Sequence, residues 1–112
     1  MKEDKVYISG PVSGMPNENR EAFAVIERFF IRRAIRCVNP VRLATLALPA
    51  GSSWVEYLKF DLYELIDCTA IVLLRGWWRS RGAILEAIVA WFLGYRFISI
   101  RVIEEELRIE AE

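Results

Sequence analysis

Four short apolar runs are spaced along the chain, and each predicts a β-strand. Glycine or proline residues lie close to the ends of these runs, as is usual where a strand gives way to a loop. The third run is apolar throughout, which is typical of a strand buried on both faces of a parallel sheet. The predicted strands are residues 5–9, 37–39, 70–74 and 95–102.

Longer segments with the apolar pattern of helices separate these runs. Two of them are amphipathic and the third is apolar nearly all round. Asparagine or serine residues near the start of each segment can cap its first turn. The predicted helices are residues 17–36, 52–66 and 82–93, while residues 41–51 are expected to form an irregular loop, and the tail after residue 102 a short helix or an edge strand.

Strands and helices therefore alternate along the whole chain. This order is typical of a three-layer α/β domain, Rossmann-like or flavodoxin-like, in which helices cover both faces of a parallel sheet of four or five strands. Right-handed crossovers favour the strand order 2-1-3-4, and residues 1–112 are expected to form one domain. Ligands bind such folds beyond the carboxyl ends of the strands, which points to residues 9–14, 39–42 and 75–82.

One charged residue interrupts the most apolar helix. Between Gly82 and Tyr95, Glu86 carries the only formal charge, and it lies within two turns of the predicted helix start at Ser80. A buried carboxylate shifts its pKa or needs strong hydrogen bonds, while the positive end of a helix lowers its energetic cost. Glu86 is therefore a candidate nucleophile or general base. The alternative is a partly exposed glutamate at the edge of the core, or a structural partner of an arginine.

A second acid lies on an apolar face in the preceding helix. At about 100° per residue, Asp61 falls between Trp54, Leu58 and Leu65, and the polar residues of the helix lie opposite. This position fits a functional acid, and equally a buried aspartate that accepts hydrogen bonds from the N–H groups of a neighbouring loop. Tyr7 presents a similar choice, because it can point into the core or toward a pocket; from the pattern alone it belongs to the core.

The loops after the first and third strands offer further polar and aromatic groups. Ser9, Ser13 and the backbone N–H groups of the loop SGPVSGMPNEN can surround a polar or anionic ligand, although the loop lacks the spacing of a dinucleotide or P-loop motif. Ser80 precedes a helix, where it can contact a phosphate or serve as a simple N-cap. Trp77 and Trp78 can stack on a nucleobase or form an oligomer interface.

The composition narrows the possible chemistry. The chain has no histidine and two isolated cysteines, Cys37 and Cys68. No metal centre is therefore expected. The absence of a disulfide framework predicts a reducing, cytoplasmic setting. Fifteen basic and fifteen acidic residues cancel, which argues against a nucleic acid polymer as partner. The longest apolar stretch is too short to cross a membrane. An apolar fraction of 54% in a small domain favours a homo-oligomer.

Several of these residues occur together in a known pattern. The segments YISGPVSGMPNEN, Asn39-Pro40 and WVEYLKFDLYELIDCTAIVLLRGWWRSRGAILEAIVAWFLG resemble the DUF4406 family of small phage and bacterial domains, over about residues 5–100. That family is similar in turn to the nucleoside 2-deoxyribosyltransferases and the deoxynucleoside 5'-monophosphate N-glycosidases. The resemblance implies N-glycosidic bond cleavage or deoxyribosyl transfer on a nucleoside or nucleotide, without a cofactor.

The resemblance also implies roles for single residues. Glu86 matches the family's nucleophile, Asp61 the acid that helps to protonate the leaving base, and Tyr7 a tyrosine that orients the nucleophile. Ser80 matches a serine that contacts phosphate, which favours a nucleotide over a nucleoside. A nucleotide-binding module without turnover, or an oligomeric interaction protein, is the alternative. The expected substrate-binding residues are Ser9, Gly10, Pro11, Ser13, Gly14, Asn39, Gly76, Trp77, Ser80 and Gly82.

Overall fold

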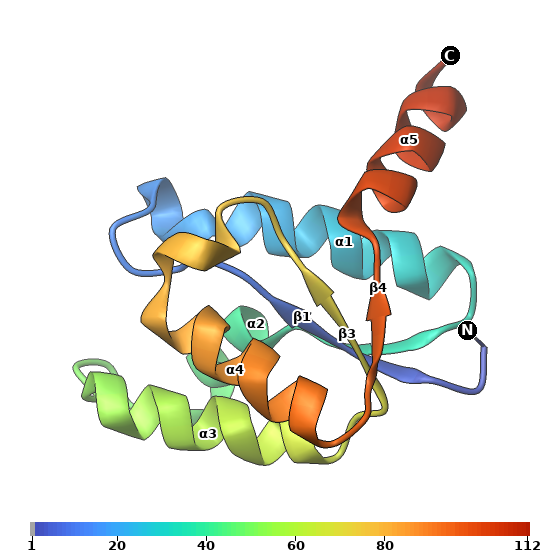
Figure 1. Cartoon of the computed structure of the whole chain (residues 1–112). Coiled ribbons are helices and arrows are strands. Elements are labelled where there is room, and N and C mark those ends of the chain that lie inside the picture. The colour runs from blue at the N-terminus through green and yellow to red at the C-terminus, as the bar shows by residue number, and fades with distance from the viewer. Residues whose placement is uncertain (1) are drawn as a thin grey trace.

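Four parallel strands in the order β2-β1-β3-β4 form the centre of the computed structural model, which describes residues 2–112 (Figure 1). This is the predicted order. Val6 on the central strand pairs with Cys37 on one side and with Ala70 on the other. The strands are β1 (Lys5–Ser9), β2 (Arg36–Val38), β3 (Ala70–Leu73) and β4 (Arg96–Ile98).

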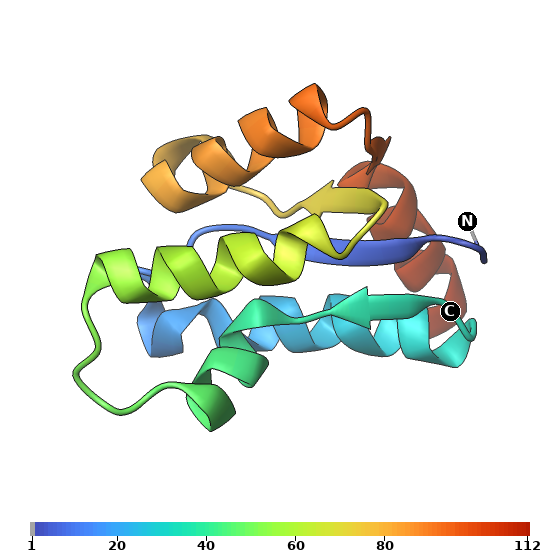
Figure 2. The same cartoon turned by 90° about the horizontal axis from the view of Figure 1, so that it is seen from below.

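Helices cover both faces of the sheet, which confirms the predicted three-layer α/β architecture. Figures 1 and 2 show α3 and α4 together on one side of the sheet and α1 on the other. Two short 3-10 helices lie in the loops that follow β1 and β3. The helices are α1 (Arg20–Arg32) and α5 (Ile100–Ala111) on one face, α3 (Trp54–Ile66) and α4 (Arg81–Phe92) on the other, α2 (Pro40–Ala47) after β2, and the 3-10 helices η1 (Pro16–Asn19) and η2 (Trp77–Arg79).

The two faces of β1 contribute to two parts of the core, because successive side chains of a strand point to opposite faces. Ile8 packs with Phe23 and Phe30 of α1. Tyr7, by contrast, packs on the other face with residues of α3 and α4. The same alternation puts Ser9 on the face of Tyr7, so both side chains point toward the layer that contains α4.

The prediction of an irregular loop over residues 41–51 is wrong for the first part of this segment, which belongs to helix α2. Asn39 caps this helix, because its side-chain oxygen accepts a hydrogen bond from the backbone N–H of Arg42 at 3.2 Å. Pro40 takes the first helical position, where its missing N–H leaves no helical hydrogen bond unmade. The sequence Asn-Pro therefore starts a helix here as well as ending a strand.

Two further boundaries differ from the prediction. The strand expected over residues 95–102 ends at Ile98, because the next residues begin α5, whose Ile100 and Ile103 pack on the core at helical spacing. The first helix ends at Arg32 rather than near residue 36, and Ala34 after it has a positive φ of 56°. Across residues 2–112, no helix is both long enough and apolar enough to pass through a membrane.

Candidate functional site

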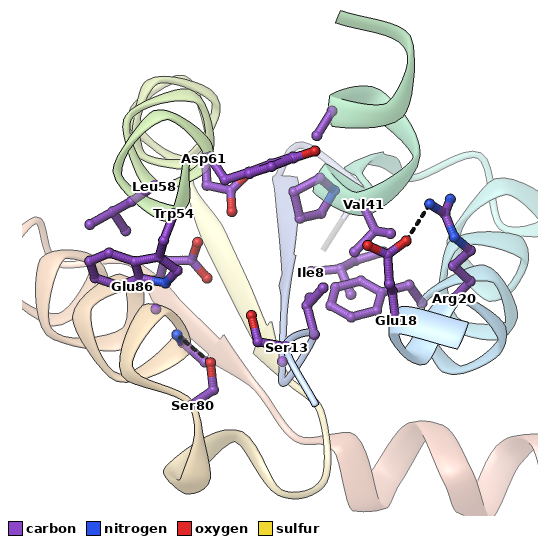
Figure 3. Close-up of a pocket in the computed structure, with 18 of the residues that line it drawn as sticks. Ile8, Ser13, Glu18, Arg20, Val41, Trp54, Leu58, Asp61, Ser80 and Glu86 are labelled. Atoms are coloured by element: carbon purple, nitrogen blue, oxygen red, sulfur yellow. Dashed lines mark hydrogen bonds and ion pairs between the residues drawn. The ribbon is translucent and has the colours of Figure 1, made fainter. Parts of the chain in front are cut away.

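A cavity of about 300 Å³ opens at the carboxyl end of β1, where the strand order reverses (Figure 3). This is the position that the topology of such folds predicts, and the volume lies within the range of small-molecule pockets. The loop after β1 forms part of the lining. Residues of α3 and α4 form one side of the cavity, and residues of α1, α2 and η1 form the other.

Glu86 reaches this cavity from α4, and its carboxylate is held by two hydroxyl groups of β1. The side chain is buried, with 5% of its surface exposed. The Tyr7 hydroxyl donates to Oε2 at 2.8 Å, and the Ser9 hydroxyl donates to Oε1 at 2.6 Å. Tyr7 and Ser9 are themselves buried and lie outside the cavity lining, so they position Glu86 from behind.

The surroundings of Glu86 balance two opposing effects on its charge. Burial raises the pKa of Glu86, the hydrogen bonds from Ser9 and Tyr7 lower it, and the net value is about 7. Burial, followed by the charge of Glu86, raises the pKa of Tyr7 well above its ordinary value, so its hydroxyl keeps its proton and remains a donor. Glu86 is thus a carboxylate that can be ionised near neutral pH while almost free of water.

Asp61 projects into the same cavity from α3. Burial is the main reason that its pKa is raised to about 8, and the negative charges of Glu86 and then Glu64 add to the effect. Asp61 therefore carries its proton at neutral pH, whereas Glu86 titrates close to neutrality. Two carboxyl groups in one cavity whose surroundings differ in this way are candidates for a general acid and a nucleophile or base.

The remaining predicted residues on the lining are Gly10, Ser13, Ser80 and Gly82. Ser80 is an N-cap of α4, since its hydroxyl oxygen accepts a hydrogen bond from the backbone N–H of Ala83 at 3.2 Å. Its side chain nevertheless faces the cavity, so the N-cap and ligand-contact interpretations are compatible. Gly10 is required by close packing, because a Cβ there would lie 2.8 Å from Cβ of Leu74.

Asn39 was expected to bind substrate, but the structure gives it a structural position outside the lining. Besides capping α2, it donates through its side-chain amide to Glu27 Oε1 at 3.1 Å. The same Glu27 carboxylate accepts from Arg42, whose Nη2 lies 2.7 Å away. Asn39, Glu27 and Arg42 thus join α1 to the start of α2.

Trp77 also lies outside the cavity, together with Pro11, Gly14 and Gly76. Trp77 instead lines a separate shallow groove on the outer side of α4. Its ring packs edge to face against the ring of Trp78, and the two ring centroids are 6.4 Å apart. This placement favours the interface interpretation of Trp77 over stacking on a base in the cavity. The groove is lined by Trp77, Ile84, Ala87, Ile88, Trp91, Phe92 and Phe97.

Other residues of the lining were not expected from the sequence. Glu18, Arg20 and Thr45 form part of the wall opposite α3 and α4. Glu18 lies within the loop SGPVSGMPNEN but was not singled out there, no motif marks Arg20, and Thr45 belongs to the segment predicted as a loop. Trp54 and Leu58 also line the cavity, and here a signal existed, because both share a helical face with Asp61.

The fold and the cavity define an α/β domain with a buried carboxylate at the switch point of a parallel sheet. A family model described as "Domain of unknown function (DUF4406)" matches residues 4–99. The chain therefore belongs to the DUF4406 family, as its sequence motifs suggested. No curated protein matches the chain.

Proposed function

We propose that this protein cleaves the N-glycosidic bond of a nucleotide or nucleoside, or transfers its deoxyribosyl group, with Glu86 as nucleophile. The observation that carries the proposal is the buried Glu86 carboxylate, held by Tyr7 and Ser9 and facing a cavity that also contains Asp61. The resemblance to nucleoside 2-deoxyribosyltransferases and monophosphate N-glycosidases supports the same chemistry.

The first step exchanges one bond for another at the anomeric carbon. A Glu86 oxygen bonds to this carbon while the C–N bond breaks and its electron pair leaves with the base. Asp61, protonated at neutral pH, gives its proton to the departing nitrogen. The products are a neutral base, a glycosyl ester on Glu86 and an ionised Asp61, so the negative charge moves from one carboxyl group to the other.

The second step restores both groups. Water, or the nitrogen of an acceptor base, attacks the same carbon and releases the Glu86 carboxylate, and Asp61 takes up the proton that the attacking group loses. Both steps pass through an oxocarbenium-like state, which a nearby carboxylate stabilises as in glycoside hydrolysis. The hydroxyls of Tyr7 and Ser9 keep the Glu86 oxygens in place while the charge on them changes.

The start of α4 supports a 5'-monophosphate as the preferred substrate. Ser80 and the N-terminal end of this helix face the cavity, and a helix N-terminus offers N–H groups and a positive partial charge to an anion. Asp61 is neutral at pH 7, which reduces the negative charge that a phosphate would meet. The remaining parts of the proposal are a cytoplasmic location, a homo-oligomer, and no requirement for a cofactor.

Base release is the direct test. Nucleosides and 5'-monophosphates of each common base, in ribose and deoxyribose forms, are incubated with the protein and analysed for free base by chromatography. We expect Glu86→Gln to reduce release at least about a thousandfold while leaving ligand binding within about tenfold, because it removes a nucleophile but little volume.

Glu21→Gln is the matched control, since this α1 side chain is 84% exposed and lies outside the cavity. Its rate should equal that of the unmodified protein. Undiminished release by the Glu86 variant would contradict the proposed mechanism. Nucleotide binding without release by the unmodified protein would instead favour a binding module without turnover.

A further inference from the structure

The cavity wall opposite Glu86 and Asp61 carries an ion pair that the steps described above do not use. The Arg20 guanidinium donates to the Glu18 carboxylate and, at 3.1 Å, to Thr45 Oγ1. Both charged side chains line the cavity, and Figure 3 shows them across it from Asp61 and Glu86. Because Thr45 belongs to α2, its contact fixes the pair between two elements of this wall.

The backbone takes an unfavourable conformation where it presents Glu18. Asn17, Glu18 and Asn19 have φ values of 50°, 57° and 60°, in the left-handed region that asparagine adopts more readily than most residues but that is unfavourable for Glu18. The backbone N–H of Glu18 donates to the Met15 carbonyl at 3.0 Å, and the side-chain amide of Asn19 donates to the Pro11 carbonyl at 2.9 Å. Strain of this kind is concentrated at ligand sites, where surrounding contacts maintain it.

Arg20 is the one basic residue among the described residues that line the cavity. Its partner Glu18 neutralises it, so the pair as a whole does not attract a phosphate strongly. A carboxylate only accepts hydrogen bonds and a guanidinium only donates them. Side by side, they instead complement a flat group that has donors next to an acceptor.

The position of the pair suits the outer edge of a nucleobase. With the anomeric carbon at Glu86 and the base beside Asp61, the edge farthest from the sugar points across the cavity toward Glu18 and Arg20. Guanine has two adjacent donors on this edge, N1–H and the 2-amino group, followed by the acceptor O6. The two oxygens of a carboxylate can accept both donors, and an arginine is a usual partner of O6.

We propose that Glu18 and Arg20 read this edge and make the site selective for a guanine nucleotide. The inference rests on the proposed function, because Glu86 and Asp61 set the direction in which the base points. In this arrangement, Glu18 and Arg20 contact the base but not the bond that breaks, and they determine specificity rather than rate.

Calorimetric titration of the Glu86→Gln protein, which binds without turnover, tests the inference. The probes are the 2'-deoxy 5'-monophosphates of guanine, hypoxanthine and adenine, together with 2-deoxyribose 5-phosphate, which has no base. We expect guanine to bind about tenfold to a hundredfold more tightly than adenine, and hypoxanthine, which lacks the 2-amino group, to lie between them. Adding Glu18→Gln should remove the preference for the guanine nucleotide over the hypoxanthine nucleotide. The affinity for the adenine nucleotide should change by less than about twofold.

Adding Arg20→Gln instead should weaken guanine and hypoxanthine alike, since both carry O6, and leave 2-deoxyribose 5-phosphate unchanged. The matched controls are Glu21→Gln and Arg28→Gln, exposed residues of α1 outside the cavity, which should leave all four affinities unchanged. If Arg20→Gln weakens all four ligands equally, Arg20 holds the phosphate and the inference is overturned.

Base release by the protein with Glu86 intact separates the two proposals. Release from all bases with equal kcat/KM, lost in Glu86→Gln, would overturn the selectivity for guanine while supporting the proposed function. Release from no substrate, with guanine still bound most tightly, would overturn the enzymatic function and support the selectivity. Binding of none of the four probes would contradict both.

Discussion

Glu86 and Asp61 share one cavity but have different surroundings, and the difference fits the roles proposed for them. Glu86 accepts hydrogen bonds from Tyr7 and Ser9, which favour its charged form against the effect of burial. For Asp61, burial and the charge of Glu86 both favour the protonated form. With pKa values of about 7 and about 8, the reactive combination is an ionised Glu86 beside a protonated Asp61.

This combination predicts a narrow, bell-shaped pH profile. We expect kcat/KM for base release to rise as Glu86 loses its proton around pH 7, and to fall as Asp61 loses its proton around pH 8. Initial rates between pH 5 and pH 10 provide the measurement. Asp61→Asn should remove the alkaline fall and should reduce the rate least for bases that leave easily. A flat profile over this range would contradict the assignment of both groups.

At the scale of elements, α4 performs two tasks in the site. Its N-cap residue, Ser80, lines the cavity, and its second turn carries Glu86. The helix is fixed at its start by the Ser80 N-cap, so one rigid element sets the positions of the proposed phosphate contact and of the proposed nucleophile. A ligand that spans both would therefore contact α4 at two points.

Ser80→Ala tests the phosphate contact. We expect a 5'-monophosphate to bind more tightly than the matching nucleoside, and the variant to reduce this preference by about 1.5–3 kcal/mol, the range for a hydrogen bond to a charged group. Titration of both ligands against both proteins is the measurement. Ser53→Ala is the control, because Ser53 caps α3 in the same way but lies outside the cavity. Equal affinity for nucleotide and nucleoside in the unmodified protein would leave Ser80 as an N-cap only.

The elements could be predicted where the pattern of side chains was local. The apolar run Ala70–Leu73 and the serine before α3 were sufficient for β3 and for the start of that helix. Helix α2 was missed because Asn39 and Pro40 serve both as a strand end and as a helix start. The structure decides between the two, because the side-chain oxygen of Asn39 accepts a hydrogen bond from the backbone N–H of Arg42 and so caps a helix.

The site could be predicted only in part, for a similar reason. Glu86 and Asp61 stand out because an acid on an apolar face is unusual in any sequence. The contact between Tyr7 and Glu86 joins residues 79 positions apart, so spacing could not reveal it and only the family resemblance suggested it. Glu18 and Arg20 reach the cavity through a left-handed turn that two asparagines favour, but no local pattern indicates that the side chains of Glu18 and Arg20 lie on the cavity wall.

At the scale of the whole molecule, the outer side of α4 is unusually apolar. Trp91 and Phe92 are 69% and 75% exposed, and they border the groove that contains Trp77. The groove residues carry no charge, so the surface suits an apolar partner, and a second copy of the chain presents the same surface in return.

We therefore expect a homo-oligomer at micromolar concentration, measured by light scattering coupled to size-exclusion chromatography. Trp91→Glu should dissociate it, because the introduced charge would be buried in the interface. Tyr63→Glu is the control, since Tyr63 is 77% exposed on α3 and lies outside the groove. A monomeric unmodified protein would rule out this prediction.

Burial of Glu86 also links the folding equilibrium to proton concentration. In the unfolded chain its pKa is near 4.5, and in the folded chain it is about 7. The folded state therefore binds the proton more tightly. The free energy of unfolding that Glu86 contributes in this way is fully present below pH 4.5 and is lost as the pH rises through 7. At 1.36 kcal/mol per pKa unit, the loss is about 3 kcal/mol.

Urea unfolding at pH 5 and at pH 9 measures this linkage. We expect the unmodified protein to be less stable at pH 9, and Glu86→Gln to show a difference smaller by about 3 kcal/mol, since it has no proton to lose. An equal difference in the two proteins would contradict the raised pKa. In alkaline solution, then, the substitution that is expected to abolish base release should make the chain harder to unfold, and selection for stability alone would remove this glutamate.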